Sequence, residues 1–530
     1  MKRKSITINA LLLLMSFSVF AQDKRPNIVL ILVDDLGFSD IAPYGGDELQ
    51  TKNINQLAKE GTRFQEFYNN SICALTRASL LTGQYSHKAG IGYFNVNLGL
   101  PAYQGFLNKE SLTLAEVLKN SGYSTIISGK WHVGDDFDQW PAQRGFERSF
   151  NFVGGASNFY EINNPDSATV SLYKNNEPFY LSKDKYLTDE ITEQAIGFLK
   201  EQQKDNKPFF LYLAYNAPHW PLQVPEEETQ KYKDAYSLGW DSLRIKRFEQ
   251  AQAKGVFPKG QAITQRDSSI QAWNKLTYDE QQYWKRRQQV FAGMIDRVDQ
   301  NIGRIQKTLK ELKKDKNTII IFLSDNGAQG GERNRIYTSR TSGTVGSAGS
   351  YDVQNSNWSQ TGNSPLRSYK DNPYEGGISA PFIVWYPKEV KANRIKRGTG
   401  HLIDIAPTLY DFAEAKYPTS FAAVETNQLP GKSLRSLLNS DQVQVERDKP
   451  LCWERAGNRA VRYGQWKLVS IFRKGNVWEL YNIDEDRAEN IDLASKHPEI
   501  VKELAAYYGD WAKENGVIDY SKIQQQRIIR

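Results

Sequence analysis

Two pairs of oxygen-bearing side chains stand directly behind long aliphatic runs of the chain. The first pair, Asp34 and Asp35, follows the run 27–33, and the second pair is Asp325 and Asn326. Ligands of open α/β sheets bind at the carboxyl ends of strands, where such pairs would lie. Adjacent carboxylates repel one another unless a cation lies between them. Asp34 and Asp35 alone could be a capping or turn pair, but two such strand ends favour a Ca²⁺ site, with Mg²⁺ as the alternative.

Basic side chains follow further strand-like runs. Lys130 and His132 come just after the run 124–127, His219 follows a run that ends at residue 213, and Lys370 precedes a glycine pair. No histidine-rich or thiolate cluster indicates zinc or copper. A single histidine more often packs or lies on the surface than catalyses, so we assign structural roles to the remaining three, His87, His401 and His497.

The elements that position these residues alternate along the first two-thirds of the chain. Continuous β-branched and aliphatic runs are typical of strands buried on both faces. Strands alternating with helices predict an α/β fold with a mostly parallel central sheet. The predicted strands cover residues 27–33, 124–127, 209–213 and 318–323, and the predicted helices cover residues 54–60, 112–118 and 288–312.

The sequence pattern changes after about residue 435, where long apolar runs give way to short alternating ones. Short alternating strands around 460–462, 466–469 and 478–481, followed by a helix over 498–515, predict a small α+β domain with an antiparallel sheet. We therefore expect a catalytic α/β domain over residues 22–435 and a C-terminal domain over 436–530. Two stretches interrupt the first domain: 224–283 is expected to wrap the surface, and 327–363 is expected to form a long functional loop.

The N-terminus has the pattern of a secretory signal. Three basic residues precede the apolar stretch 8–20, which is too short for a comfortable membrane span. Residues 1–21 are therefore predicted to be a cleaved signal peptide that exports the protein to the periplasm or the medium. The chain has no cysteine at the cleavage site for a lipid anchor, and no later stretch predicts a membrane span.

Charge and cysteine content exclude some classes of protein. The formal net charge of +7 is a weak bias that implies no nucleic-acid partner. The two cysteines, Cys73 and Cys452, could form a disulfide in an exported protein. A chain this long does not need a single disulfide, and Cys73 lies in a run that has another explanation.

That run, Ser71–Gly83, resembles the signature of the type I sulfatases. Its sequence contains Cys73-Ala-Leu-Thr-Arg77 and then Ala-Ser-Leu-Leu-Thr-Gly, where the family has Cys-x-Pro-x-Arg before the same six residues. In that family a maturation enzyme oxidises the cysteine to formylglycine, an aldehyde whose hydrate attacks sulfur. Leu75 stands where the family has proline, so the chain departs from the family at one position of the motif that the maturation enzymes read.

Further blocks resemble the same family in the same order, from residue 26 almost to the C-terminus. The bacterial arylsulfatases are the most similar subgroup. The matching blocks are 26–37, Gly-Lys-Trp-His at 129–132, Ala-Pro-His at 217–219, 236–244, Leu-Ser-Asp-Asn-Gly at 323–327, 363–370 with Glu-Gly-Gly at 375–377, 404–409, 466–468 and 479–481.

The resemblance implies an alkaline-phosphatase-like large domain and assigns a role to each matching residue. Arg77 would orient the aldehyde hydrate, and Lys130 and Lys370 would hold sulfate oxygens. His132 would help to break down the sulfated intermediate, and His219 would lie beside the leaving-group oxygen. The implied Ca²⁺ ligands are Asp34, Asp35, Asp325, Asn326 and the modified Cys73.

These roles agree with the chemistry of sulfate monoesters. Fixed cations around the peripheral oxygens stabilise the charge of the transition state, and a metal ion activates the nucleophile. We therefore expect an exported sulfatase that acts on a sulfated saccharide or an aryl sulfate. The alternatives are a phosphate mono- or diesterase of the alkaline phosphatase superfamily, and a non-catalytic sulfoglycan-binding protein that lost the modification motif.

The loop 327–363 is expected to set substrate preference rather than catalytic competence. It begins directly after Asn326 and ends just before Lys370, so it should border the sulfate site, as should the segment around Asn158 and Tyr160. Tyr337 and Trp358 are the side chains expected to contact a sugar. The alternative is a surface excursion with no role in binding.

Overall fold

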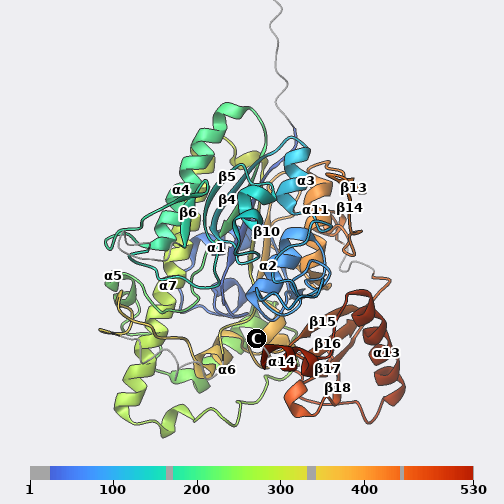
Figure 1. Cartoon of the computed structure of the whole chain (residues 1–530). Helices are drawn as coiled ribbons and strands as arrows, with labels where there is room; N and C mark the ends of the chain where they lie inside the picture. The colour runs from blue at the N-terminus through green and yellow to red at the C-terminus, as the bar shows by residue number, and fades with distance from the viewer. Residues whose placement is uncertain (1–23, 163–170, 331–341, 442–446, 529–530) are drawn as a thin grey trace, which may run out of the picture.

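The computed structural model describes residues 24–162, 171–330, 342–441 and 447–528, which form a large domain and a smaller one beside it (Figure 1). Ten described strands form the central sheet of the large domain. Its parallel centre has the order β9 (Thr318–Ser324), β1 (Asn27–Val33), β8 (Phe209–Ala214), β4 (Ser124–Lys130) and β5 (Arg148–Phe152).

Shorter strands extend the sheet at both edges. Beyond β9 lie β10 (Phe382–Trp385), β2 (Thr62–Phe64) and β11 (Arg394–Lys396), and beyond β5 lie β6 (Leu172–Lys174) and β7 (Glu177–Pro178). β10 runs antiparallel to β9, and β6 runs antiparallel to β5. The α/β class with a mostly parallel sheet, predicted from the aliphatic runs, is confirmed.

The aliphatic runs form strands because both of their faces are buried. In β1, Val29 and Ile31 pack into one hydrophobic core, and Ile28 and Leu30 pack into a second core on the opposite face. The first core includes α1 (Lys52–Glu60), α4 (Leu187–Gln202) and α7 (Tyr278–Glu311). The second includes α2 (Cys73–Thr82), α3 (Leu114–Asn120) and α11 (Ile405–Phe412), so helices cover both faces (Figure 1).

The long helix α7 begins about ten residues earlier than the predicted start at 288. Thr277 caps it: the Thr277 hydroxyl accepts from the Glu280 amide at 3.3 Å, and the Glu280 carboxylate accepts from the Thr277 amide at 2.8 Å. This capping box fixes the helix start independently of apolar spacing. The first turns are mostly exposed, so the apolar pattern that predicts a buried helix face is missing there.

The stretch 224–283, predicted to wrap the surface, contributes helices and a buried tryptophan to the large domain. It forms α5 (Glu226–Gln230), which packs on α7, and α6 (Gly239–Ala253). Trp240 of α6 is fully buried, and its ring packs edge-to-face against Trp273, Trp284 and Trp358 at centroid distances of 4.8–6.2 Å. This aromatic cluster joins three segments that are far apart in the sequence.

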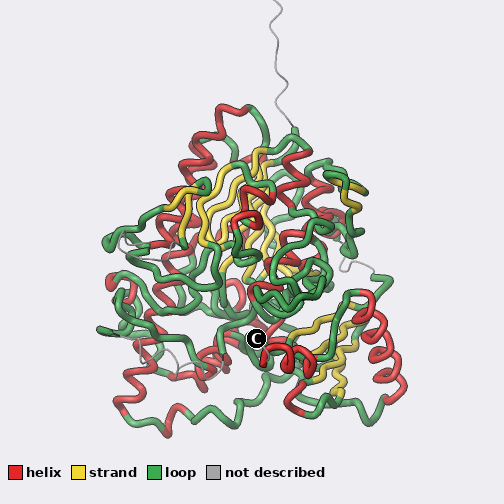
Figure 2. Tube along the Cα trace, viewed as in Figure 1, coloured by secondary structure: helices red, strands yellow, loops and turns green. Residues whose placement is uncertain are grey.

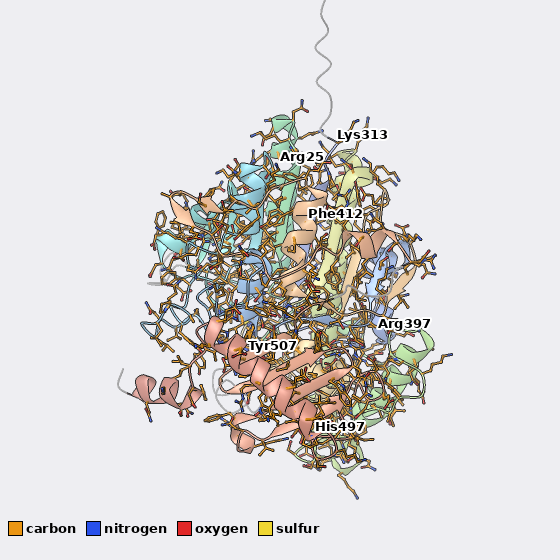
Figure 3. The ribbon with its side chains drawn as sticks, turned by 90° about the vertical axis from the view of Figure 1, so that its right-hand side faces the viewer. Arg25, Lys313, Arg397, Phe412, His497 and Tyr507 are labelled. Atoms are coloured by element: carbon orange, nitrogen blue, oxygen red, sulfur yellow. The ribbon has the colours of Figure 1, made fainter. Side chains whose placement is uncertain are left out.

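The small domain contains a four-stranded antiparallel sheet in chain order, visible in Figure 2 as a second group of strands. Its strands are β15 (Leu451–Arg455), β16 (Asn458–Tyr463), β17 (Trp466–Ser470) and β18 (Trp478–Asn482). The helix α13 (Pro498–Glu514) covers one face, and Figure 3 labels His497 at its start and Tyr507 further along. A final helix, α14 (Tyr520–Ile528), was not predicted. The small α+β domain itself is confirmed, and its boundary at residue 435 remains a proposal.

Two sequence predictions concern residues outside the described ranges. The signal peptide over 1–21 and Tyr337 of the long loop both lie there. Among the helices of the described ranges, none has the length and apolar character that a membrane span requires.

Candidate active site

Four neighbouring strands deliver polar side chains to one edge of the central sheet. β9, β1, β8 and β4 are adjacent and parallel, so their carboxyl ends meet. Asp325 and Asn326 follow β9, Asp34 and Asp35 follow β1, and Lys130 ends β4. All five side chains are 0% exposed, so the predicted strand ends form one buried cluster.

The helix α2 brings Cys73 and Arg77 to the same cluster. Cys73 is the first residue of α2, and Arg77 follows one helical turn later on the same face. The Cys73 Sγ and carboxylate oxygens of Asp34 and Asp325 lie within 4.8 Å of one another. Leu75 lies between Cys73 and Arg77 in the sequence but is buried in the apolar core of the domain. The cysteine and the arginine therefore share the site, whereas Leu75 supports the helix.

The cluster pairs three carboxylates with three cations. Lys130 Nζ lies 2.5 Å from Asp34 Oδ2, and Lys370 Nζ lies 2.7 Å from Asp35 Oδ1. The Arg77 guanidinium contacts Asp34 at 3.3 Å and Asp325 at 3.1 Å. These side chains have formally balanced charges, so a bound dication would make the site positive and attractive to an anionic ester.

Three buried oxygens of the cluster fit a hard cation. Asp34 Oδ1, Asp35 Oδ2 and Asn326 Oδ1 accept no hydrogen bond from the described residues. Asn326 turns its amide nitrogen away, donating to Asp35 Oδ1 at 2.6 Å and to the Gly327 carbonyl at 2.9 Å. Buried oxygens normally have a partner, and carboxylate and amide oxygens are ligands for Ca²⁺ and Mg²⁺. The donor set therefore suits either ion.

Burial and neighbouring charges act in opposite directions on the carboxylates. Burial opposes ionisation of Asp34, but Lys130, His219 and Arg77 outweigh it and hold the pKa of Asp34 well below its usual range. Burial and then the charge of Asp34 raise the pKa of Asp325 to about 8. The ionised form of Asp34 is thus favoured and that of Asp325 is disfavoured, as expected when like charges share a site.

His219 lies at the edge of the cluster. Its Nδ1 is 2.7 Å from the Trp220 carbonyl, and its Nε2 is 3.7 Å from Asp35 Oδ2. Because a carbonyl only accepts, Nδ1 carries the proton of the neutral ring, and Nε2 takes up a second proton when the ring is charged. Burial lowers the pKa of His219 to about 4, so the ring is neutral at neutral pH.

His132 is fully buried beyond the end of β4. Neither ring nitrogen has a hydrogen-bond partner among the described residues. Phe94 packs edge-to-face on the ring at 5.0 Å, and a Cβ at Gly155 would lie 2.6 Å from Nε2, so only glycine fits there. Burial and then Lys130 lower the pKa of His132 well below its ordinary value. His132 and Asp35 also have positive φ angles of 60° and 68°, a strained backbone typical of functional sites.

The segment that carries Lys370 is fixed by a buried ion network. Lys467 Nζ of β17 lies 2.8 Å from Glu375 Oε1 and 2.9 Å from Glu489 Oε1, and Arg487 Nε lies 3.3 Å from Glu375 Oε2. All four side chains of the network are 0% exposed. The small domain thus holds the α10 turn (Glu375–Ile378), which follows Lys370 by five residues.

Sequence reasoning missed the residues that support the site. Arg77 donates to the Tyr212 hydroxyl at 3.4 Å, and the Thr76 hydroxyl donates to the Asp325 carbonyl at 2.6 Å. Tyr212 carries the one hydroxyl in the aliphatic and aromatic run that forms β8. A single polar group in an otherwise apolar strand could have marked Tyr212 as a residue that supports the site. Glu375 belongs to a matched block, but its partners Lys467 and Arg487 lie about a hundred residues away, which no local pattern reveals.

The predicted role of Trp358 in sugar binding is wrong. Trp358 is 1% exposed, belongs to the aromatic cluster of Trp240, and donates its indole N–H to the Trp284 carbonyl at 2.9 Å. It is a core residue in α9 (Ser356–Gly362). The apolar side of the loop 327–363 packs inward, because an indole this large is stabilised by burial against other aromatic rings. Asn158 is exposed, whereas Tyr160 is partly buried against Tyr186, and the role of this segment in substrate preference remains a prediction.

Comparisons with known protein families cover nearly the whole described chain. The family model "Sulfatase" matches residues 26–415, and the model "N-sulphoglucosamine sulphohydrolase, C-terminal" matches residues 369–511. The first match contains every predicted site residue, and the second contains Lys370 and the ion network that supports it.

Individual proteins agree with the family models. An uncharacterised sulfatase of Schizosaccharomyces pombe is 35% identical, covering 95% of this chain and 96% of that one, and the arylsulfatase of Klebsiella aerogenes is 31% identical, covering 82% and 97%. A solved structure of Ps i-CgsB in complex with k-i-k-neocarrahexaose superposes with a TM-score of 0.68 at 25% identity, covering 93% of each chain. The predicted alkaline-phosphatase-like architecture with a small C-terminal domain is thereby confirmed.

Proposed function

Since this chain belongs to the sulfatase family and is a sulfuric ester hydrolase, we propose that it is exported and removes sulfate from a glycan. The proposal adds a formylglycine made from Cys73 and a bound Ca²⁺, with Mg²⁺ as the alternative ion. One observation carries it: Arg77, Lys130 and Lys370 converge on the same buried cluster as Cys73 and the unpartnered carboxylate oxygens.

Lys130 and Lys370 are proposed to bind the peripheral oxygens of the sulfate group. Both ammonium groups are almost fully buried, one paired with Asp34 and the other with Asp35. Burial opposes the charge on Lys370, but Asp35 outweighs it and raises the pKa of Lys370 above its usual range. Fixed cations in a buried site stabilise the charge of the transition state without reorganising.

The residues that would hold the cation are Asp34, Asp35, Asp325, Asn326 and the modified Cys73. When bound, the ion supplies Lewis-acid stabilisation of a sulfate oxygen and favours the ionised form of the nucleophilic hydroxyl. The three unpartnered oxygens support this assignment, because a cation would satisfy all of them at once. Arg77 stays hydrogen-bonded to Asp34 and Asp325 and would orient the modified side chain one turn before it on α2.

Formylglycine at position 73 would supply a hydrate with two hydroxyl groups. One would attack sulfur, and the other would then lose its proton and become the aldehyde oxygen, while sulfate leaves with the oxygen that attacked. Proton movements are proposed to use the two buried histidines. His132 has a neutral ring with unpartnered nitrogens, so it can accept a proton from a neighbouring hydroxyl. His219 would face the leaving-group oxygen through Nε2, because its Nδ1–H donates to the Trp220 carbonyl. To protonate that oxygen, the ring would first have to take up a second proton at Nε2.

A glycan substrate is supported by the proteins that this chain resembles. The solved structure of Ps i-CgsB contains an oligosaccharide, and the matched C-terminal model is named after an N-sulphoglucosamine sulphohydrolase. The predicted signal peptide would place the enzyme where extracellular polysaccharides are degraded. Aryl sulfates would then be small surrogate substrates that use the sulfate-binding cluster alone.

The test combines mass spectrometry with substrate hydrolysis. The protein is produced with a formylglycine-generating enzyme, and the Cys73 peptide is examined for the aldehyde. Release of sulfate from 4-nitrophenyl sulfate and from sulfated saccharides, but little hydrolysis of 4-nitrophenyl phosphate, is the expected result. Faster hydrolysis of the phosphate ester would favour a phosphatase, and no sulfate release from aldehyde-containing protein would favour a non-catalytic binding protein.

Variants of the two cysteines test whether Cys73 provides the nucleophile. Cys73→Ala and Cys73→Ser, made in an ordinary host, should both lack turnover, since neither side chain can provide the aldehyde. Full activity of Cys73→Ala would contradict the assignment. The Cys452→Ala variant is the control, because Cys452 is a second buried free cysteine that belongs to the core of the small domain.

A further inference from the structure

A cavity of about 290 Å³ lies between the two domains. Its large-domain wall is formed by Asp371 and Asn372. Its small-domain wall comes from the β15–β16 turn, the short helix η9 (Phe472–Lys474) and α14. In Figure 1, α14 lies beside the small sheet, below the large domain. Binding sites occur preferentially at such domain interfaces.

Two connections join this cavity to the catalytic cluster. On one side, Asp371 directly follows Lys370, and its amide donates to the Ser71 carbonyl at 2.8 Å, two residues before Cys73. On the other side, Tyr520 packs against Tyr93 at 6.0 Å, and the next residue, Phe94, packs on His132. The cavity is therefore bordered by segments that also position the catalytic residues.

The small-domain wall provides cationic and aromatic groups. Arg455 lies 3.2 Å from Asp371, and its side chain is 18% exposed. Arg473 is exposed and has no acidic side chain within 4 Å among the described residues. Phe472 and Tyr520 pack edge-to-face at 5.1 Å. An arginine fork matches a sulfate or carboxylate, and aromatic rings pack well on the apolar face of a sugar.

We infer that this cavity is a subsite for the sugar next to the one that carries the scissile sulfate, and that it prefers a neighbour bearing a sulfate or carboxylate. The inference rests on the proposed function, because it presumes a saccharide whose sulfate occupies the catalytic cluster. Arg473 would bind the second anionic group, with Arg455 beside it, and Phe472 and Tyr520 would contact the ring. The enzyme would thus select polyanionic glycans over singly sulfated ones.

The inference is tested on matched saccharides. A panel of sulfated di- and tetrasaccharides is screened for sulfate release, and for each sugar cleaved, three forms are compared: neutral neighbour, sulfated neighbour and uronic-acid neighbour. We expect kcat/KM to be about tenfold higher with an anionic neighbour, the gain from one charge-assisted contact. Comparing the sulfated and uronic-acid forms shows which anion is preferred. The preference should shrink in high salt, since the Debye length falls from about 10 Å at 0.1 M to about 3 Å at 1 M.

Arginine variants assign the preference to the cavity. Arg473→Ala should reduce the ratio of kcat/KM values for anionic over neutral neighbours about tenfold, and Arg455→Gln should reduce it as well. Lys474→Ala is the matched control: it removes the same charge at the next position, where Lys474 Nζ lies 3.6 Å from Glu479. Binding of the same saccharides to Cys73→Ala protein, with and without Arg473→Ala, gives a second measurement that needs no turnover.

Several results would overturn the inference while leaving the sulfatase assignment intact. They are hydrolysis of 4-nitrophenyl sulfate without cleavage of any saccharide, equal rates for neutral and anionic neighbours, and equal effects of Arg473→Ala and Lys474→Ala. Loss of the proposed function looks different, because no sulfate ester would then be cleaved by aldehyde-containing protein. The binding measurement on Cys73→Ala protein would still decide whether the cavity holds an anionic sugar.

Discussion

The buried ion network between the domains makes a prediction about how Lys370 is positioned. Lys467→Met would remove the ammonium group that contacts both Glu375 and Glu489, and methionine has a similar length without charge. Glu375 would keep its contact with Arg487 at 3.3 Å, but Glu489 would lose its cation. All of these side chains are 0% exposed, so water cannot replace the missing partner.

The size of the effect follows from this burial. Removing one partner of a buried ion pair costs about 3–5 kcal/mol, because the remaining carboxylate must either stay charged in the interior or take up a proton there. With an unfolding entropy of about 2.1 cal/mol/K per residue, 4 kcal/mol would lower the Tm of a chain of 530 residues by roughly 4 °C if it unfolds as one unit. A larger shift would indicate that the small domain unfolds separately.

Catalysis should also suffer, because the network holds the turn behind Lys370. The Gly376 amide donates to the Arg367 carbonyl at 2.8 Å, and the Gly327 amide, directly after the metal-ligand candidates, donates to the Gly377 carbonyl at 3.1 Å. A shift of the α10 turn would therefore move both Lys370 and the end of β9. Displacements of about 1 Å can cost about 100-fold in rate, so we expect kcat/KM for an aryl sulfate to fall 10- to 100-fold.

The pH dependence gives an independent check. Burial raises the pKa of Glu489 from its ordinary value of 4.5 to about 7. A raised pKa contributes stability that is fully present below pH 4.5 and lost as the pH rises through 7. Wild-type stability should therefore decline between pH 5 and pH 8, and Glu489→Gln should flatten this part of the profile.

The assay is thermal unfolding combined with aryl sulfate kinetics. The double variant Lys467→Met/Glu489→Gln should recover part of the lost stability, because it removes the orphaned charge as well. Lys502→Met on the exposed face of α13 is the control for the substitution itself. Two results would refute the reasoning. One is a Lys467→Met variant with the Tm and kcat/KM of the wild type, and the other is a double variant whose Tm is no higher than that of Lys467→Met.

Three further predictions address the site and its surroundings. Chelation should lower the Tm, since the buried oxygens of Asp34, Asp35 and Asn326 that accept no hydrogen bond from the described residues would lose their ligand, and Asp325→Ala should abolish the response. An unchanged melting curve together with metal-free protein would contradict this. Leu75→Pro should fold normally, because residue 75 lies in the first turn of α2, where amide groups have no intrahelical partner. The substitution should increase the fraction of Cys73 that mass spectrometry finds as aldehyde. Equal fractions in the variant and the wild type would show that Leu75 does not limit maturation. Trp358→Ala should cost about 3–5 kcal/mol and lower kcat/KM by the same factor for a saccharide and an aryl sulfate, whereas a selective loss on the saccharide would restore its role in substrate binding.

The sequence by itself determined the fold class and the chemistry-bearing residues. The runs that became β1, β8 and β9 are almost entirely aliphatic and aromatic, and the run of β4 has Ile126 and Ile127 at its centre, because a parallel sheet covered by helices buries both faces of each strand. Polar residues directly after such runs must lie at one sheet edge, so Asp34, Asp325 and Lys130 could be placed together before the structure was known. The match to the sulfatase signature added Cys73 and Arg77, and the structure then placed both on one face of α2, one helical turn apart.

Only the tertiary structure decided which distant segments support and surround that site. Lys467 and Glu489 contact Glu375 across the domain interface, and Tyr520 reaches the loop next to His132 from the far end of the chain. Such contacts depend on how the two domains pack, and neither apolar periodicity nor local spacing encodes this packing. The same reason explains the error at Trp358: an aromatic residue in a glycine- and serine-rich loop has the same sequence pattern whether its ring faces a ligand or the core.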